Sequence, residues 1–147
     1  MLFRSLLDRG VAIDATTDEK WTALHYAAKW GRTEVVKVLL DRGATINAPN
    51  AKGRTALLEA CAFVLWSAGR IGVVKVLLER GTSTSIIDVV DISGDTALHC
   101  AARCCNAEMV QLLLDNGANN SWKNGNRQTA LDIARQLGWE RGVTLLA

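Results

Sequence analysis

Apolar residues recur along the chain at the spacing of short amphipathic helices. The first stripe follows Thr22, a residue type that caps helix N-termini, and consists of Leu24, Ala27 and Ala28. A second stripe, residues 35–40, is followed by Gly43, which suits a left-handed C-terminal cap. Residues 46–53 are polar and turn-forming. The pattern predicts a unit made of helix, turn, helix and extended loop.

This unit repeats. The tripeptide Thr-Ala-Leu begins at residues 22, 55, 96 and 129, with successive offsets of 33, 41 and 33 residues. The second stripe and its glycine, residues 35–43, return at 73–81 and 109–117. The offset of 41 exceeds 33 by eight residues, of which five precede residue 73 and three follow Gly81. We therefore divide the chain into a half unit, 1–17, three units, 18–50, 51–91 and 92–124, and a shortened unit, 125–147.

Residues 22–28, Thr-Ala-Leu-His-Tyr-Ala-Ala, resemble the ankyrin signature Thr-Pro-Leu-His-x-Ala-Ala. Residues 50–55 are similar to the hairpin that precedes the signature in that family. Four copies near a period of 33 residues extend the resemblance over nearly the whole chain. It implies one ankyrin-repeat domain, residues 1–147: an all-α solenoid of stacked helix-turn-helix units with short β-hairpin or loop fingers, stabilised by contacts between neighbouring units.

Composition narrows the function classes. A length of 147 residues suits one domain, and the net charge of +2 argues against a charge-driven nucleic-acid binder. No apolar run reaches the roughly 18 residues of a membrane span, and no secretory signal is recognisable. Three of the four cysteines lie within residues 100–105, a poor spacing for disulfides. We expect an intracellular protein, cytoplasmic or nuclear, with free thiols.

Little in the sequence indicates catalysis. His25 and His99 occupy the same repeat position, and the ankyrin resemblance implies that both bridge backbone groups. The chain offers no nucleophile–base–acid set and no glycine-rich phosphate loop. Cys100 and Cys104, four residues apart, could share a soft metal, but thiols also act as small apolar side chains. We expect no enzyme activity, no metal and no cofactor.

Two cysteines also bear on local geometry. Cys100 stands at the repeat position of Tyr26, which we expect to lean towards the surface. Cys105 stands at the position of Gly31 in the turn between helices. We expect the neighbouring Asn106 to take the left-handed conformation there, because asparagine tolerates it.

The unit 51–91 departs from the others by insertion. Residues 62–70 replace a turn of two or three residues and predict one more helical turn or a bulged apolar loop. Residues 83–91 predict a longer hairpin with 86–90 near its tip. Both insertions could cover their own repeat or form a local binding surface.

Five tryptophans are many for 147 residues. The resemblance implies that fingertips and first helices line a concave groove, and aromatic residues and arginine dominate binding energy at interfaces. We expect partner contacts from the groove and the insertion, at Lys20, Trp21, Tyr26, Lys29, Trp30, Arg54, Glu59, Trp66, Asp95, Arg103, Trp122, Lys123 and Arg127.

The favoured function is protein–protein recognition through the concave groove, as an adaptor, scaffold or inhibitor. The groove carries charges of both signs, so we expect a protein partner with mixed charges of its own, bound by a monomer, and neither nucleic acid nor membrane. Two alternatives remain. The chain could be a slice of a larger channel, enzyme or regulator that makes intramolecular contacts, as the half unit and the missing last hairpin would suit. It could instead be a small-ligand or catalytic module that uses the 62–70 insertion.

Overall fold

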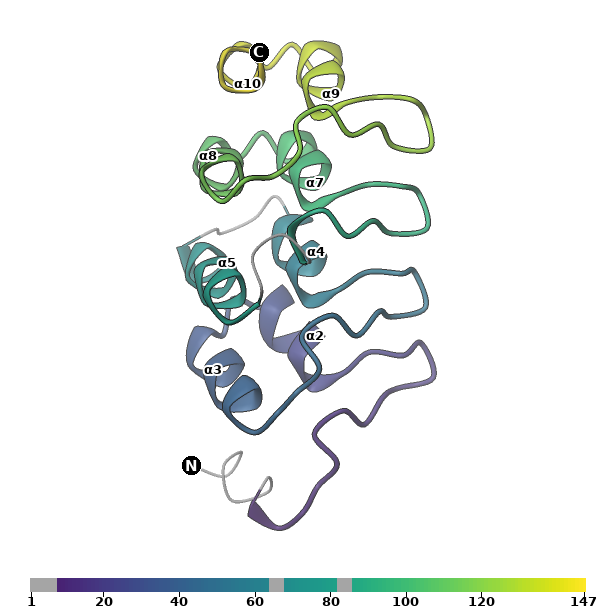
Figure 1. Cartoon of the computed structure of the whole chain (residues 1–147), viewed down its shortest axis with the longest axis vertical. Coiled ribbons are helices and arrows are strands. Elements are labelled where there is room, and N and C mark those ends of the chain that lie inside the picture. The colour runs from purple at the N-terminus through teal and green to yellow at the C-terminus, as the bar shows by residue number, and fades with distance from the viewer. Residues whose placement is uncertain (1–7, 64–67, 82–85) are drawn as a thin grey trace.

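The chain folds as a stack of helix pairs. The computed structural model describes residues 8–63, 68–81 and 86–147. First helices form one column and second helices another beside it, and loops project from the first column (Figure 1). The first helices are α2 (Ala23–Lys29), α4 (Ala56–Cys61), α7 (Ala97–Arg103) and α9 (Ala130–Gln136). The second helices are α3 (Thr33–Asp41), α5 (Ala68–Arg80), α8 (Ala107–Asp115) and α10 (Glu140–Leu146). The all-α repeat stack predicted from the sequence is confirmed.

All four first helices begin in the same way. A threonine hydroxyl accepts a hydrogen bond from the backbone N–H three residues later, at Thr22, Thr55, Thr96 and Thr129. In three of the helices the side chain at that later position bonds back to the cap, which completes a capping box. In α4 this position is Leu58, which cannot form the return bond.

The turn between the paired helices requires one left-handed residue. Gly31 supplies it in the first complete unit, with φ of 65°, and Cys105 supplies it in the third, with φ of 51°. The expectation for Asn106 is therefore wrong: its φ is −94° and it caps α8. Its side-chain oxygen accepts from the Met109 N–H at 3.0 Å, a bond that a cysteine in the same place would make only weakly.

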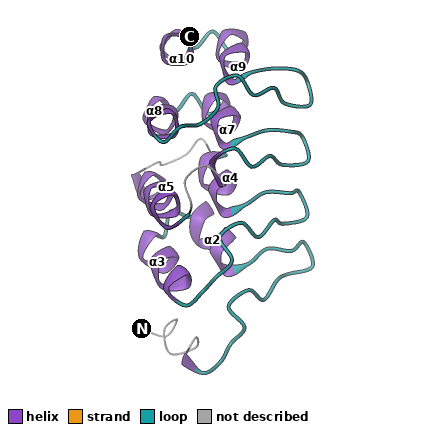
Figure 2. Cartoon of the chain, in the orientation of Figure 1, coloured by secondary structure: helices purple, strands orange, loops and turns teal. Residues whose placement is uncertain are grey.

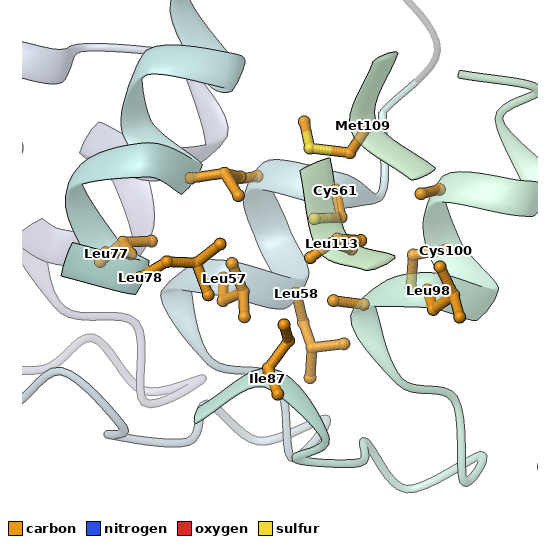
Figure 3. Packing of buried hydrophobic residues seen from close by; sticks show 14 of the residues in the cluster. Leu57, Leu58, Cys61, Leu77, Leu78, Ile87, Leu98, Cys100, Met109 and Leu113 are labelled. Atoms are coloured by element: carbon orange, nitrogen blue, oxygen red, sulfur yellow. The ribbon is translucent and has the colours of Figure 1, made fainter. Parts of the chain in front are cut away.

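The core lies between the two columns and is continuous from unit to unit. Figure 3 shows the side chains of α4, α5, α7 and α8 meeting there, including Leu58, Leu98 and Leu113. Ile86 and Ile87, expected near a hairpin tip, instead lie in a helical turn and are 3% and 1% exposed. The sequence expectation for them is wrong, because two adjacent isoleucine side chains are more stable buried in the core than exposed to water at a hairpin tip. This part of the second insertion covers its own repeat.

The first insertion lengthens the outer column. Helix α5 has 13 residues, whereas α3 and α8 have nine, which agrees with the predicted extra turn. Arg70 in that turn donates from Nε to the Lys29 carbonyl at 2.8 Å and from Nη1 to the Phe63 carbonyl at 3.2 Å. The Thr33 hydroxyl donates to the Gly69 carbonyl at 3.1 Å. The insertion is thereby fastened to the C-terminal end of α2.

Candidate protein-binding surface

Four loops, which we call the fingers, project beside the first helices: residues 17–21, 50–54, 91–95 and 124–128. Figure 2 shows them as loops, and the described part of the chain contains no strand, so the fingers are not β-hairpins with strands. Two backbone hydrogen bonds close each finger; in the second, Asn50 N–H donates to the Arg54 carbonyl and Gly53 N–H to the Asn50 carbonyl, both at 2.9 Å. One further backbone bond joins each finger to the next, from residue 51 to 19, 92 to 52 and 125 to 93.

Each finger has one left-handed residue at the same repeat position. In the middle two fingers it is Gly53 or Gly94, and in the outer two it is Lys20, with φ of 60°, or Arg127, with φ of 61°. A residue with a Cβ pays about 1–2 kcal/mol for this conformation. Both predicted site residues therefore project from positions where glycine would be more favourable.

The two histidines tie fingers together. In the first unit His25 Nδ1 accepts from the Thr22 N–H at 3.1 Å, so the proton is on Nε2, which donates to the Arg54 carbonyl at 2.9 Å. His99 makes the equivalent bonds to the Thr96 N–H and the Gln128 carbonyl. Both side chains are buried. The scaffold role expected for the histidines is confirmed.

A buried ionic network lies behind the middle fingers. Asn50 Nδ2 donates to Glu59 Oε1 at 3.1 Å, and Arg54 Nη1 lies 3.8 Å from the same oxygen. Arg54 Nε also donates to Asp91 Oδ2 at 3.3 Å. Glu59 is buried and the Asp91 side chain is nearly so. The network satisfies these carboxylates internally, as buried charges require.

Asp95 belongs to the next layer of this network. It is buried and accepts from Arg103 Nη1 at 2.7 Å and from Asn124 Nδ2 at 2.8 Å. Burial alone would raise the pKa of Asp95, but the hydrogen bonds from Arg103 and Asn124 outweigh it and hold that pKa below its ordinary value. Asp95 is thus a stably ionised group of the interior, while Arg103 remains exposed above it.

Four aromatic residues gather around one lysine. The Lys29 ammonium lies 5.1 Å from the ring centre of Trp21 and 5.6 Å from those of Trp30 and Phe63, within cation–π range. Tyr26 packs on Trp21 with ring centres 4.9 Å apart. We call these five residues the Lys29 cluster. Trp30, Tyr26 and Phe63 are 61%, 45% and 43% exposed and are open to a partner, whereas Trp21 is partly buried.

Two hollows flank Tyr26. One, of about 580 Å³, is polar and is lined by Trp21, Lys29, Lys52 and residues 17–19 of the first finger. The other, of about 660 Å³, is apolar and is lined by Ala23, Tyr26, Ala27, Trp30, Arg32 and Val35. An apolar groove beside a charged hollow is a surface suited to an amphipathic partner.

The predicted site residues fall into three groups. The first group lies at the first finger and α2, and the second is exposed at or directly before the fourth finger: Lys20, Trp21, Tyr26, Lys29 and Trp30 in the first, and Trp122, Lys123 and Arg127 in the second. Between these ends lie the network residues, which the structure brings together beneath or beside the middle fingers: Arg54, Glu59, Asp95 and Arg103. Trp66 lies outside the described residues.

Sequence reasoning missed two contributors to this surface. Phe63 completes the Lys29 cluster, and Lys52 lines the polar hollow. Both could have been found by aligning the units, because Phe63 stands at the repeat position of Trp30 and Lys52 at that of Glu19. We call four cationic residues the finger cations: Lys20, Lys52, Arg127 and Lys123, which directly precedes the fourth finger.

The cysteines contribute packing. Cys100 is 2% exposed, so the expectation that it leans towards the surface is wrong. Arg54 covers it, with Nη2 at 3.5 Å from the sulfur, and burial raises the pKa of the Cys100 thiol to about 12.

In residues 8–63, 68–81 and 86–147 no group of three or more His, Cys, Asp and Glu side chains is placed to hold a metal ion. No helix within those ranges is long and apolar enough to cross a membrane.

Comparison with known proteins agrees with the repeat geometry. A family model that describes three copies of the ankyrin repeat matches two overlapping ranges of the chain, residues 1–88 and 65–147. The chain therefore belongs to the ankyrin-repeat family.

Similar curated proteins are much longer than this chain. It is 30% identical over 154 residues to human neurogenic locus notch homolog protein 2, covering 86% of this chain and 6% of that protein. It is 27% identical over 119 residues to the putative palmitoyltransferase ZDHHC13 of Danio rerio, covering 81% and 18%. Over 61 residues it is 44% identical to ankyrin repeat, SAM and basic leucine zipper domain-containing protein 1 of Chlorocebus aethiops, covering 42% and 13%.

Proposed function

We propose that the chain is a protein-recognition module that holds a protein partner across its fingers and first helices, as an adaptor, scaffold or inhibitor would. Ankyrin repeats are generally protein-interaction modules, which supports the coarse assignment. The observation that carries the finer one is the exposed Lys29 cluster. Tryptophan and tyrosine are the residue types that most often dominate interface energetics, and here they are fixed on a stacked scaffold.

The mechanism we propose is rigid presentation. The backbone bonds between fingers and the histidine bridges hold the contact residues in place before a partner arrives. Little conformational entropy is then lost on binding. The network residues Glu59 and Asp95 support the surface from below, while Arg103 and the end groups make contact.

The role proposed is non-catalytic. Both histidines are engaged by backbone groups, and the likeness to a palmitoyltransferase covers 18% of that protein. Four free cysteines, three of them fully or partly buried, favour a reducing compartment such as the cytoplasm or nucleus. We propose a monomer as the binding species.

Affinity capture tests the proposal. A variant with Trp21→Ala, Tyr26→Ala and Trp122→Ala is compared with the natural chain and with an outer-helix control, Lys75→Ala, Glu79→Ala and Gln111→Ala. We expect a partner that the natural chain and the control retain and that the aromatic variant loses. A partner retained equally by all three would place binding elsewhere and contradict the proposal. Circular dichroism establishes that each variant is folded.

A further inference from the structure

The charge that this surface presents to solvent differs from the charge in its sequence. Glu59, Asp91 and Asp95 are the carboxylates of α4 and the middle fingers, and all three are covered and bonded to arginine or asparagine. The network therefore removes negative charge from the surface. The folded groove therefore exposes fewer carboxylates than its sequence contains.

The positive charges stay outside. Lys29 and the four finger cations have no carboxylate within 4 Å in the described part of the chain. The exposed carboxylates of the fingers are Asp18 and Glu19, both in the first finger. Asp132 of α9 adds a partly exposed carboxylate, which lies 4.0 Å from Arg135 and interacts electrostatically with Lys123. Five cations thus face three carboxylates, and none of the exposed residues in the second, third and fourth fingers is acidic.

Two of these cations occupy costly positions. Lys20 and Arg127 are left-handed where the middle fingers have Gly53 and Gly94. Cys105 has the same conformation in a turn between helices, so the strain alone assigns no function. Neither Lys20 nor Arg127 forms an ion pair within the described residues, so both charges are available to a partner.

Lys29 has the most directed setting. Its ammonium is half-buried among aromatic faces rather than bonded to an acid. A carboxylate that reached it would be partly screened from water, which strengthens the ion pair. The rings beside it, with the apolar groove past Tyr26, would take an apolar side chain from the same ligand.

We propose that the partner segment bound by this surface is an acidic peptide that combines carboxylates with apolar residues. One carboxylate pairs with Lys29, an apolar neighbour packs on Tyr26 and Trp30, and further carboxylates meet the finger cations. This inference rests on the proposed function and specifies the partner's chemistry.

Fluorescence polarisation on the full chain tests the inference. The probe is a labelled peptide of alternating Glu and Phe or Ala, and the matched control peptide has Lys in place of every Glu. We expect the acidic peptide to bind at least about tenfold more tightly, and its affinity to fall several-fold between about 50 mM and about 300 mM salt. The Lys peptide should bind weakly at either salt concentration.

Two kinds of variant should change the affinity for the acidic peptide in opposite directions. Lys29→Gln, and separately Lys20→Gln with Arg127→Gln, should each weaken the acidic peptide by about threefold to tenfold. Asp18→Asn with Glu19→Gln should strengthen it, because repulsion at the first finger is removed. Lys75→Gln on the outer face of α5 is the matched control and should change nothing.

Several results would overturn the inference. They are equal binding of the two peptides, no binding of the acidic peptide, and tighter binding of single-stranded RNA or of phosphatidylserine vesicles than of the acidic peptide. A partner captured from cells that requires Trp21 and Trp122 but is indifferent to Lys29→Gln and to salt would overturn the acidic chemistry and leave the proposed function standing. A captured partner indifferent to both sets of variants would overturn both.

Discussion

One repeat position meets two surroundings along the stack. Tyr26 in α2 is 45% exposed, whereas the matching residues of α4, α7 and α9, namely Glu59, Cys100 and Ile133, are 5%, 2% and 4% exposed. Each of those three helices packs against the first helix before it, and α2 has no such neighbour among the described residues. The same helical template thus yields buried residues in α4, α7 and α9 and an exposed ring in α2. A residue's repeat position alone does not assign its role.

The strongest way to break this comparison is to truncate both kinds of residue. Ile133→Ala should lower the free energy of unfolding by about 2–4 kcal/mol, because it removes buried methylenes and leaves a cavity. Tyr26→Ala should cost under about 1 kcal/mol, because the ring is half in water. Urea unfolding at constant m-value measures both. Equal losses would mean that α2 is as well covered as α9.

A similar contrast holds for carboxylates. Asp95→Ala should destabilise the chain by about 1–3 kcal/mol, since it leaves Asn124 without its acceptor and Arg103 without its partner. Asp18→Ala, in the exposed first finger, should change stability by less than about 0.5 kcal/mol. Thermal melts of the two variants against the natural chain give the comparison. An unchanged melting temperature in Asp95→Ala would show that the network contributes little to the stability of the fold.

The network also predicts a pH dependence. Because the folded pKa of Asp95 is lowered, its ionised form stabilises the fold above the ordinary pKa of aspartate, and this contribution is lost as pH falls through the lowered value. Melting temperature should therefore decline at acid pH. The decline should be shallower in Asp95→Asn, which has no proton to take up. Parallel profiles for the two proteins would argue against this role of the Asp95 charge.

The smallest effect concerns the left-handed fingertips. Lys20→Gly should raise stability by about 0.5–1 kcal/mol, since glycine adopts a φ of 60° without a Cβ penalty. Gly53→Ala should do the reverse, because its added Cβ would also lie 3.2 Å from the backbone nitrogen of Ile92. Chemical denaturation resolves shifts of this size. A destabilised Lys20→Gly would mean that the lysine side chain supports the finger itself.

The architecture was predictable because it is written locally. The threonine caps recur in all four first helices, and each is satisfied by a backbone N–H three residues later. The two insertions were harder. Nothing local indicates that Ile86 and Ile87 turn inward, since that depends on the space left between α5 and the next unit.

The candidate site was predictable only in part. Aromatic content and the ankyrin resemblance led to the prediction of Tyr26, Trp30 and Trp122 as contact residues, and the structure shows that all three are exposed. Trp21, predicted with them, is only partly exposed. The sequence could not show that Glu59 and Asp95 are paired with arginines and hydrogen-bonded to asparagines. The stacking of units brings these partners together. Net charge at a surface is a property of which ions remain unpaired, and that required the fold.

The strained turn at Cys105 has a practical consequence. Cys105 is the one exposed cysteine of the four. Burial raises the pKa of Cys61, Cys100 and Cys104 and keeps their thiolates scarce at neutral pH. A maleimide dye added to the unmodified chain should thus couple at a single point. That point is the turn between α7 and α8, so one label would report partner binding by energy transfer to an acceptor on the peptide without any engineered cysteine.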